Sequence, residues 1–255
     1  SLLDAADFFL KRQQRSLGIS ESEKMKIAIK SLGLDDLRPF DPKKKVIEYM
    51  LEEPGAERLV SMDLKKFTEE TAGESPAPGG GSVGAYVGAL GAALGTMVAN
   101  LSAHKRGWDD KWDQYSEWAV IGEKHRNELL YLVDEDTRAF DRILAAFGLP
   151  KGSDAEKAAR AKAITEATKG AINTPLRTME VCVESMALMQ AMAETGLPAS
   201  VSDAGVGAVC ARAGAIAGYL NILINCSGLN DADFKTKVLA KAEALRSRSE
   251  ERRVG

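Results

Sequence analysis

An uncharged run over residues 83–103 limits what this chain can fold into, because it places four glycines on one side of a helix. The glycines recur at intervals of four, three and four residues, which is the spacing of one helical face: Gly84, Gly88, Gly91 and Gly95. A glycine inside a helix costs about 1 kcal/mol relative to alanine, so four of them indicate that another backbone approaches closely. The pattern predicts a helix at the centre of a tightly packed bundle or at a subunit interface.

The segment before this run, residues 75–82, reads Ser-Pro-Ala-Pro-Gly-Gly-Gly-Ser. Its prolines and glycines are unfavourable inside a helix or a sheet, so it predicts a tight loop that leads into a helix near Ser82. The first N–H groups of that helix, together with its positive dipole end, would suit an anion. The alternative interpretation is that the glycines only allow close packing and the loop is only a turn.

An uncharged run of about 20 residues is also long enough to cross a membrane, and regularly spaced small residues are a packing motif of membrane helices. Three observations argue against that interpretation. The run is rich in Gly and Ala instead of Leu and Ile, the loop before it has no basic cluster, and the mean hydropathy of the chain is -0.19. We therefore expect a buried helix of a soluble protein and no membrane partner.

Charge and cysteine content exclude several classes of protein. The formal net charge of -3 leaves no basic field that would attract nucleic acid. Three cysteines at wide spacing predict reduced core residues in a cytoplasmic protein. With two histidines and no cysteine pair at ligand spacing, we expect no metal site.

The rest of the chain predicts further helices and no strand, because no segment alternates apolar and polar residues. Capping and breaking residues place helices at about 20–33, 41–54, 63–73, 109–147, 154–195 and 231–246, with one more from 200 to beyond 225. Asp154 is expected to cap the fifth of these, Pro175 to kink it, and Ser200 with Asp203 to cap the helix that follows.

This following helix also has a face of small residues, formed by Gly207, Ala211, Gly214 and Gly218. The two glycine-containing faces either pack on each other or each pack on a symmetry mate. The predicted fold class is all-α, a bundle of long antiparallel helices with Gly/Ala-faced central helices.

One acidic residue of the long helix over 109–147 falls on its apolar side. Leu129, Val133 and Phe140 mark a stripe that continues to Ile143 and Phe147, and Asp136 completes it seven residues after Leu129. Asp134 is expected to point elsewhere and to pair with Arg138 on a wet face. An acid on an apolar stripe loses hydration, which makes Asp136 a candidate for acid–base chemistry. The alternative is a structural aspartate neutralised by an arginine or a helix end.

Several of these segments together resemble the formimidoyltetrahydrofolate cyclodeaminase family. The resemblance covers residues 63–233 in order, through the segments 75–82, 88–101, 132–140, 148–151, 202–206 and 221–225. Residues 1–51 resemble the C-terminal end of a bacterial glutamate formimidoyltransferase domain. We therefore expect a transferase remnant over residues 1–55, without transferase activity because most of that domain is absent, and a helical cyclodeaminase domain over residues 61–255.

The resemblance implies a dimer-forming enzyme of histidine degradation and one-carbon metabolism, which converts 5-formimidoyltetrahydrofolate to 5,10-methenyltetrahydrofolate and ammonia. It places the catalytic acid within residues 133–136, and the stripe selects Asp136 over Asp134. No cofactor or metal is expected, since the tetrahydrofolate derivative is the substrate. The partners expected are this folate, with or without a polyglutamate tail, and further copies of the same chain.

The carboxylates of a folate would bind either to the N-terminal end of a helix or to cationic side chains. The candidates at the helix start are Gly79, Gly80, Gly81 and Ser82, and the candidates at the far helix end are Lys105 or Arg106. Asp203 and Asn225 are further substrate-binding candidates from the matching segments, although Asn221 and Asn225 also suit plain helix-end hydrogen bonds. The presence of Lys105 at a helix C-terminus is equally explained by the helix dipole, which favours a cation there. His104 is either an acid–base group or an exposed helix-end residue.

Two other functions fit the same residues. One is a methenyltetrahydrofolate cyclohydrolase on the same scaffold, in which water replaces the intramolecular amine. The other is a helical assembly module without chemistry, whose glycine faces serve only oligomerisation.

Overall fold

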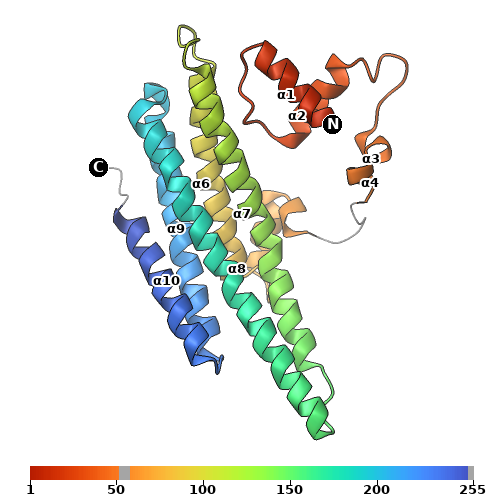
Figure 1. The fold of residues 1–255 in the computed structure, drawn as a ribbon, viewed down its shortest axis with the longest axis vertical. Helices are drawn as coiled ribbons and strands as arrows, with labels where there is room; N and C mark the ends of the chain where they lie inside the picture. Colours follow the sequence, from red (N-terminus) through yellow and green to blue (C-terminus); the bar gives the residue numbers. More distant parts are fainter. Residues whose placement is uncertain (52–57, 252–255) are drawn as a thin grey trace.

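The computed structural model describes residues 1–51 and 58–251, and over these residues it contains helices and no strand. Five long helices run side by side as a bundle (Figure 1): α6 (Gly80–Ala103), α7 (Trp112–Phe147), α8 (Asp154–Thr195), α9 (Val201–Ser227) and α10 (Ala232–Glu251). The predicted all-α bundle is confirmed.

The chain before the bundle forms short helices: α1 (Leu2–Arg12), α2 (Glu21–Ser31), α3 (Pro42–Lys45), α4 (Ile47–Met50) and α5 (Leu64–Thr71). The prediction of one helix from Asp41 onward is wrong, because the backbone at Val46 is extended and separates α3 from α4. Pro54 and Gly55, expected to end that helix, lie outside the described residues. Asp41 and Asp63 cap α3 and α5 as expected.

The glycines of α6 allow close contact with two neighbouring helices. A Cβ on Gly91 would lie 2.6 Å from the Gly207 carbonyl oxygen, and one on Gly84 would lie 2.6 Å from Ala217 Cβ, so these two glycines face α9. Gly88 and Gly95 face Cys182 and Leu188 of α8 instead. The two small-residue faces therefore pack on each other within one chain, and α6 packs against both α8 and α9.

Some helix ends differ from the prediction. Ser153 caps α8 through a capping box with Glu156, so Asp154 is not the cap. No side chain caps α9, and α10 continues past Arg246 to Glu251. Pro175 lies inside α8, which is helical on both sides of it.

The apolar stripe of α7 is buried at Leu129 and Val133 but not further along. Phe140 and Phe147 are 40% and 52% exposed and Ile143 is half-buried, so the predicted stripe is only partly buried beyond Val133. The long hairpin of α7 and α8 extends past the other helices, and Figure 1 shows its tip lying well beyond the end of α6. The distal part of α7 therefore has fewer helices to pack against.

Three hydrogen bonds join the backbone of residues 16–18 to side chains of the bundle. Ser16 N–H donates to His104 Nε2 at 2.9 Å and Leu17 N–H donates to Ser116 Oγ at 2.9 Å, while Asn100 Nδ2 donates to the Gly18 carbonyl at 2.8 Å. A Cβ on Gly18 would overlap Ala119. His104, expected to be either an acid–base group or an exposed helix-end residue, thus holds this connection.

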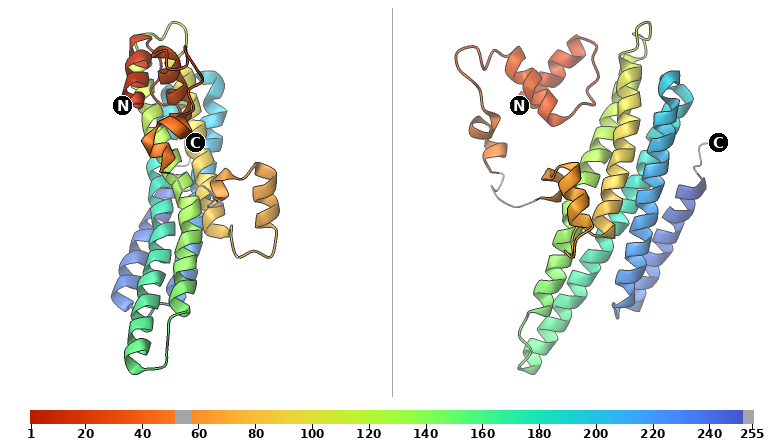
Figure 2. Two further views of the ribbon diagram at one scale, coloured as in Figure 1. Left: turned by 90° about the vertical axis from the view of Figure 1, so that its right-hand side faces the viewer. Right: turned by 180° about the vertical axis from the view of Figure 1, so that it is seen from behind.

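Two helical stretches are long and apolar enough to cross a membrane by length and composition alone, Gly80–Ala103 and Pro198–Ser227. The first is largely buried, with 61% of its most apolar window inside the bundle, whereas the value for the second is 33%. Both lie against α8, and Figure 2 shows α6 and α9 side by side on one face of the bundle. The apolar side of α9 is therefore largely exposed in the single chain.

Candidate active site

Asp136 of α7 lies at the N-terminal end of α6, where the glycine-rich loop enters the helix. Its Oδ2 accepts a hydrogen bond from Ser82 Oγ at 3.1 Å. The N-cap of α6 is Gly79, which has no side chain to cap the helix. The carboxyl group of Asp136 therefore sits where the α6 dipole favours negative charge.

Gly81 makes this approach possible. A Cβ at this position would overlap the carboxyl group of Asp136. Because any larger residue at position 81 would push Asp136 away, one role of the Gly-rich segment is to let an acid from another helix reach the start of α6.

Asp136 is partly buried, and burial raises the pKa of its carboxyl group above the ordinary value. The hydroxyl and the backbone N–H of Ser82 act in the opposite direction and lower this pKa. The environment thus brings the titration of the acid closer to neutral pH, as acid–base catalysis requires.

Asp136 opens into a small pocket of about 150 Å³ at the junction of four helices. Its walls come from the loop before α6 and from α6 to α9: Pro76, Ala77, Gly79, Gly80, Gly81, Asp136, Thr137, Phe140, Ile143, Ala171, Asn221 and Asn225. Asp136 is the only ionisable side chain among these lining residues, all of which are described. A carboxylate without a paired cation in such a pocket favours a positively charged ligand.

Three uncharged polar side chains share the pocket with Asp136. The amide nitrogens of Asn221 and Asn225 donate to the carbonyls of Ala217 and Ala171, each at 2.9 Å, which leaves their side-chain oxygens as acceptors for a ligand. Thr137 Oγ1 is buried and has no hydrogen-bond partner. Thr137 is not among the site residues predicted from the sequence, although its position next to Asp136 is a usable signal.

Asp134 is not on a wet face, and this prediction is wrong. Its side chain is buried, and its Oδ1 accepts a 2.8 Å hydrogen bond from the N–H of Leu59. Arg138 pairs instead with Glu135 at 2.9 Å. Asp134 therefore fixes the segment before α5 on the bundle, while Asp136 faces the pocket.

The structure brings together six of the predicted site residues: Gly79, Gly80, Gly81, Ser82, Asp136 and Asn225. Lys105 follows the other end of α6, about 36 Å away by the rise of 24 helical residues, and Arg106 is next to it. Asp203 lies in the first turn of α9, which runs antiparallel to α6, so it is also at that far end. Substrate binding by Lys105 and Asp203 stays a prediction.

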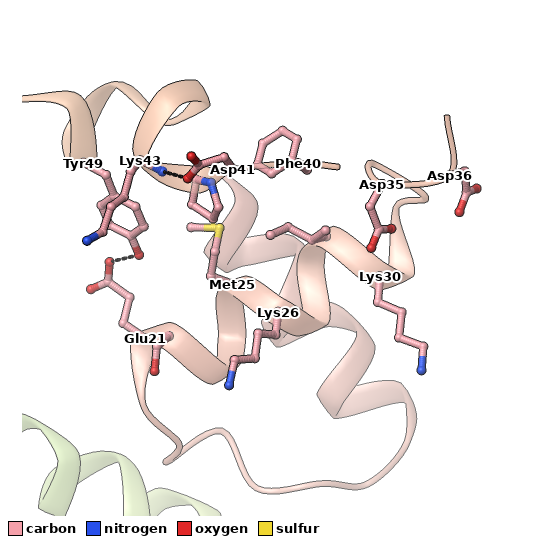
Figure 3. Close-up of a pocket in the computed structure, with 13 residues that line it drawn as sticks. Glu21, Met25, Lys26, Lys30, Asp35, Asp36, Phe40, Asp41, Lys43 and Tyr49 are labelled. Carbon is pink, nitrogen blue, oxygen red and sulfur yellow. Dashed lines mark hydrogen bonds between the residues drawn. The ribbon is translucent and has the colours of Figure 1, made fainter. Parts of the chain in front are cut away.

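A second, larger cavity of about 1050 Å³ lies in the N-terminal region between α2 and the α3–α4 segment (Figure 3). Met25 and Phe40 line it together with charged residues such as Lys26 and Asp35, and Tyr49 donates a hydrogen bond to Glu21 across one side. Its lining contains none of the predicted site residues, so the candidate active site is the pocket at Asp136.

Comparison with known proteins decides the family. Residues 63–244 match the family model described as Formiminotransferase-cyclodeaminase, and residues 1–52 match the model described as Formiminotransferase domain. The chain belongs to the formiminotransferase-cyclodeaminase family. The resemblance drawn from the sequence segments is confirmed.

Relatives in this family carry two kinds of name. The formimidoyltransferase-cyclodeaminase of Rattus norvegicus is 35% identical over 246 residues, which are 96% of this chain and 45% of that protein. The methenyltetrahydrofolate cyclohydrolase of Methylorubrum extorquens is 38% identical over 182 residues, covering 71% of this chain and 88% of that protein. The chain thus spans about half the length of the formimidoyltransferase-cyclodeaminases that it matches.

The bundle also matches the solved structure of a cyclodeaminase. The formiminotetrahydrofolate cyclodeaminase of Thermotoga maritima superposes with a TM-score of 0.66 at 29% sequence identity. The superposition covers 75% of this chain and 92% of that structure, so this helical architecture is common to both proteins.

Proposed function

We propose that this chain converts 5-formimidoyltetrahydrofolate to 5,10-methenyltetrahydrofolate and ammonia, with Asp136 as the catalytic acid–base. The observation that carries the proposal is a pocket whose only ionisable lining residue is a partly buried carboxyl group with a raised pKa. The substrate has a cationic amidine on N5, which is the charge that such a pocket favours. The cyclodeaminases among the relatives support the same reaction.

The proposed reaction needs one group that moves a proton. N10 attacks the formimidoyl carbon and forms a tetrahedral centre, after which ionised Asp136 accepts the N10 proton and delivers it to the former imino nitrogen. The bond from carbon to that nitrogen then breaks, ammonia leaves, and the positive charge stays on the methenyl bridge. Proton transfer of this kind contributes about 10²–10⁴ in rate.

The reaction needs no cofactor or metal. In the described part of the chain, no group of three or more His, Cys, Asp and Glu residues is placed to hold a metal ion. The expectation that the folate derivative is the substrate and that no other cofactor takes part therefore stays as a prediction.

Two assays on the same preparation test the proposal against its nearest alternative. We expect ammonia release from 5-formimidoyltetrahydrofolate at a kcat at least tenfold above the hydrolysis of 5,10-methenyltetrahydrofolate. The cyclohydrolase relative makes the second assay necessary. Hydrolysis as the faster reaction would replace the proposal with the cyclohydrolase, and the absence of both would favour a non-catalytic assembly module.

We further propose that two copies of this chain associate through the exposed side of α6 and α9, here called the α6–α9 face. Each helix presents uncharged residues at alternating intervals of three and four: Val83, Val87, Leu90, Leu94, Met97 and Leu101 on α6, with Val206, Val209, Ala213, Ile216, Leu220 and Leu223 on α9. This spacing suits helix-on-helix packing.

A lipid bilayer is a poor alternative, because the adjoining helices α7 and α8 carry charged residues along their length. We therefore place the protein in the cytoplasm.

Association would also enlarge the site. A pocket of about 150 Å³ holds the reacting group but falls below the 300–1,000 Å³ typical of sites for drug-sized ligands. Asn221 and Gly80 place this pocket at one end of the α6–α9 face. A two-fold axis that reverses the helix direction would set the Lys105 end of one copy beside the pocket of the other, where a cation suits folate carboxylates.

The association is tested by Leu90→Glu, which puts a charge in the middle of the α6 row. We expect the parent protein to be a dimer or larger in light scattering, and the variant to dissociate because a buried unpaired charge is costly. Leu144→Glu on α7 is the matched control, since Leu144 is similarly exposed but lies outside the α6–α9 face. A monomeric parent, or an equal effect of both substitutions, would show that this face is not the interface.

A further inference from the structure

The hydroxyl group of Ser82 lies between two acceptors on the neighbouring helix α7. Its Oγ is 3.0 Å from the Val133 carbonyl oxygen and 3.1 Å from Asp136 Oδ2, and the side chain is fully buried. A hydroxyl group carries one proton, so it can donate fully to only one of these oxygens. We propose that Ser82 is a positioning residue for Asp136, which donates to the ionised carboxylate and turns to the Val133 carbonyl when the acid is protonated.

Both protonation states then have a complete set of hydrogen bonds. With Asp136 ionised, the Ser82 O–H donates to the carboxylate. With Asp136 protonated, its O–H donates to Ser82 Oγ, and the Ser82 O–H donates to the Val133 carbonyl. Only hydroxyl hydrogens rotate between the two states. The inference rests on the proposed function, because a proton relay must pass through both states in every turnover.

The pocket offers Asp136 no second charged or titratable partner. The lining residues from α6, α7, α8 and α9 bring no second titratable or charged side chain. On α7 itself, Asp134 is held by the N–H of Leu59, and Glu135 pairs with Arg138 and Arg142. Among the described side chains that bond to the carboxyl group of Asp136, Ser82 is thus the donor.

Removing the Ser82 hydroxyl should raise the pH at which Asp136 loses its proton. A hydrogen bond to a charged group is stronger than one to a neutral group, so Ser82→Ala removes more stabilisation from ionised Asp136 than from protonated Asp136. Asp136 then stays protonated to higher pH, and the acid limb of the pH profile of kcat/KM moves to higher pH. We expect a displacement of roughly one pH unit. Ser82→Thr keeps the hydroxyl and should restore the parent profile.

The decisive experiment titrates Asp136 directly by infrared difference spectroscopy, with its carbonyl band assigned by its absence in Asp136→Asn. We expect the midpoint to rise in Ser82→Ala and to stay unchanged in Ser102→Ala, a buried serine of the same helix that donates to the Val98 carbonyl. An unchanged or lowered midpoint in Ser82→Ala would overturn the proposal. The titration needs no turnover, so a failure of the proposed function shows separately as missing ammonia release.

Discussion

Replacing Asp136 with asparagine is expected to lower kcat for ammonia release by about 10²–10⁴-fold while the protein stays folded. An amide of the same shape can still accept a hydrogen bond from Ser82, but it can neither take the N10 proton nor balance the amidinium charge. The measurement is steady-state ammonia release, with circular dichroism as the check on folding.

The stability of Asp136→Asn follows from the sign of the pKa change. Because the pKa of Asp136 is raised in the folded protein, the unfolded chain loses this proton at lower pH. The folded state therefore loses stability as the pH rises from the unfolded to the folded pKa of this carboxyl group, and the full penalty remains at higher pH. The neutral amide removes that penalty, so we expect Asp136→Asn to melt no lower than the parent at pH 8.

Asp134→Asn is the matched control for the catalytic assignment. Asp134 is buried two residues away and accepts the Leu59 N–H, which an asparagine oxygen can also accept. Its substitution should leave ammonia release within about threefold of the parent, given that a retained neutral hydrogen bond costs little. Equal losses in the two variants would mean that Asp136 has no special role.

Gly91→Ala is expected to destabilise the bundle by about 1–3 kcal/mol, a large effect for a single methyl group. The new Cβ would lie 2.6 Å from the Gly207 carbonyl oxygen and 2.9 Å from the Ala211 nitrogen. Both atoms belong to the backbone of α9, so neither can rotate away as a side chain would. Chemical denaturation with an unchanged m-value measures the loss.

Gly205→Ala separates this contact from the intrinsic preference of helices for alanine. Gly205 also lies in a helix, but a Cβ there would meet nothing within 4 Å. We expect it to stabilise the protein by up to about 1 kcal/mol. If Gly91→Ala also stabilised the protein, the close approach of α6 and α9 would be refuted.

The sequence was sufficient to predict the helical bundle and the close packing of its glycine faces, because both depend on local spacing. The choice of Asp136 came from an apolar stripe whose members Phe140 and Ile143 line the same pocket as Asp136, although Phe140 and Phe147 are partly exposed. The stripe could not predict which element would form the opposite wall of this pocket. The start of α6 reaches it from 54 residues earlier in the chain, and Gly81 leaves room for the carboxyl group.

Contacts of this kind depend on the register between helices, which local patterns do not determine. The same limit explains Asp134, whose partner is the backbone of Leu59, 75 residues away. Local patterns also could not show that Asp203 lies at the Lys105 end of α6, a helix length away from the glycine-rich loop.

The connection between residues 16–18 and the bundle has a consequence for how the two regions can evolve. Three bundle side chains, from Asn100, His104 and Ser116, bond only to main-chain atoms of that segment. These three hydrogen bonds depend on the path of the main chain and not on the side chain of Leu17. We expect homologous sequences to vary at Leu17 more than at Ser16, whose buried Oγ accepts the Gly18 N–H, and to retain Gly18, where a Cβ would overlap Ala119.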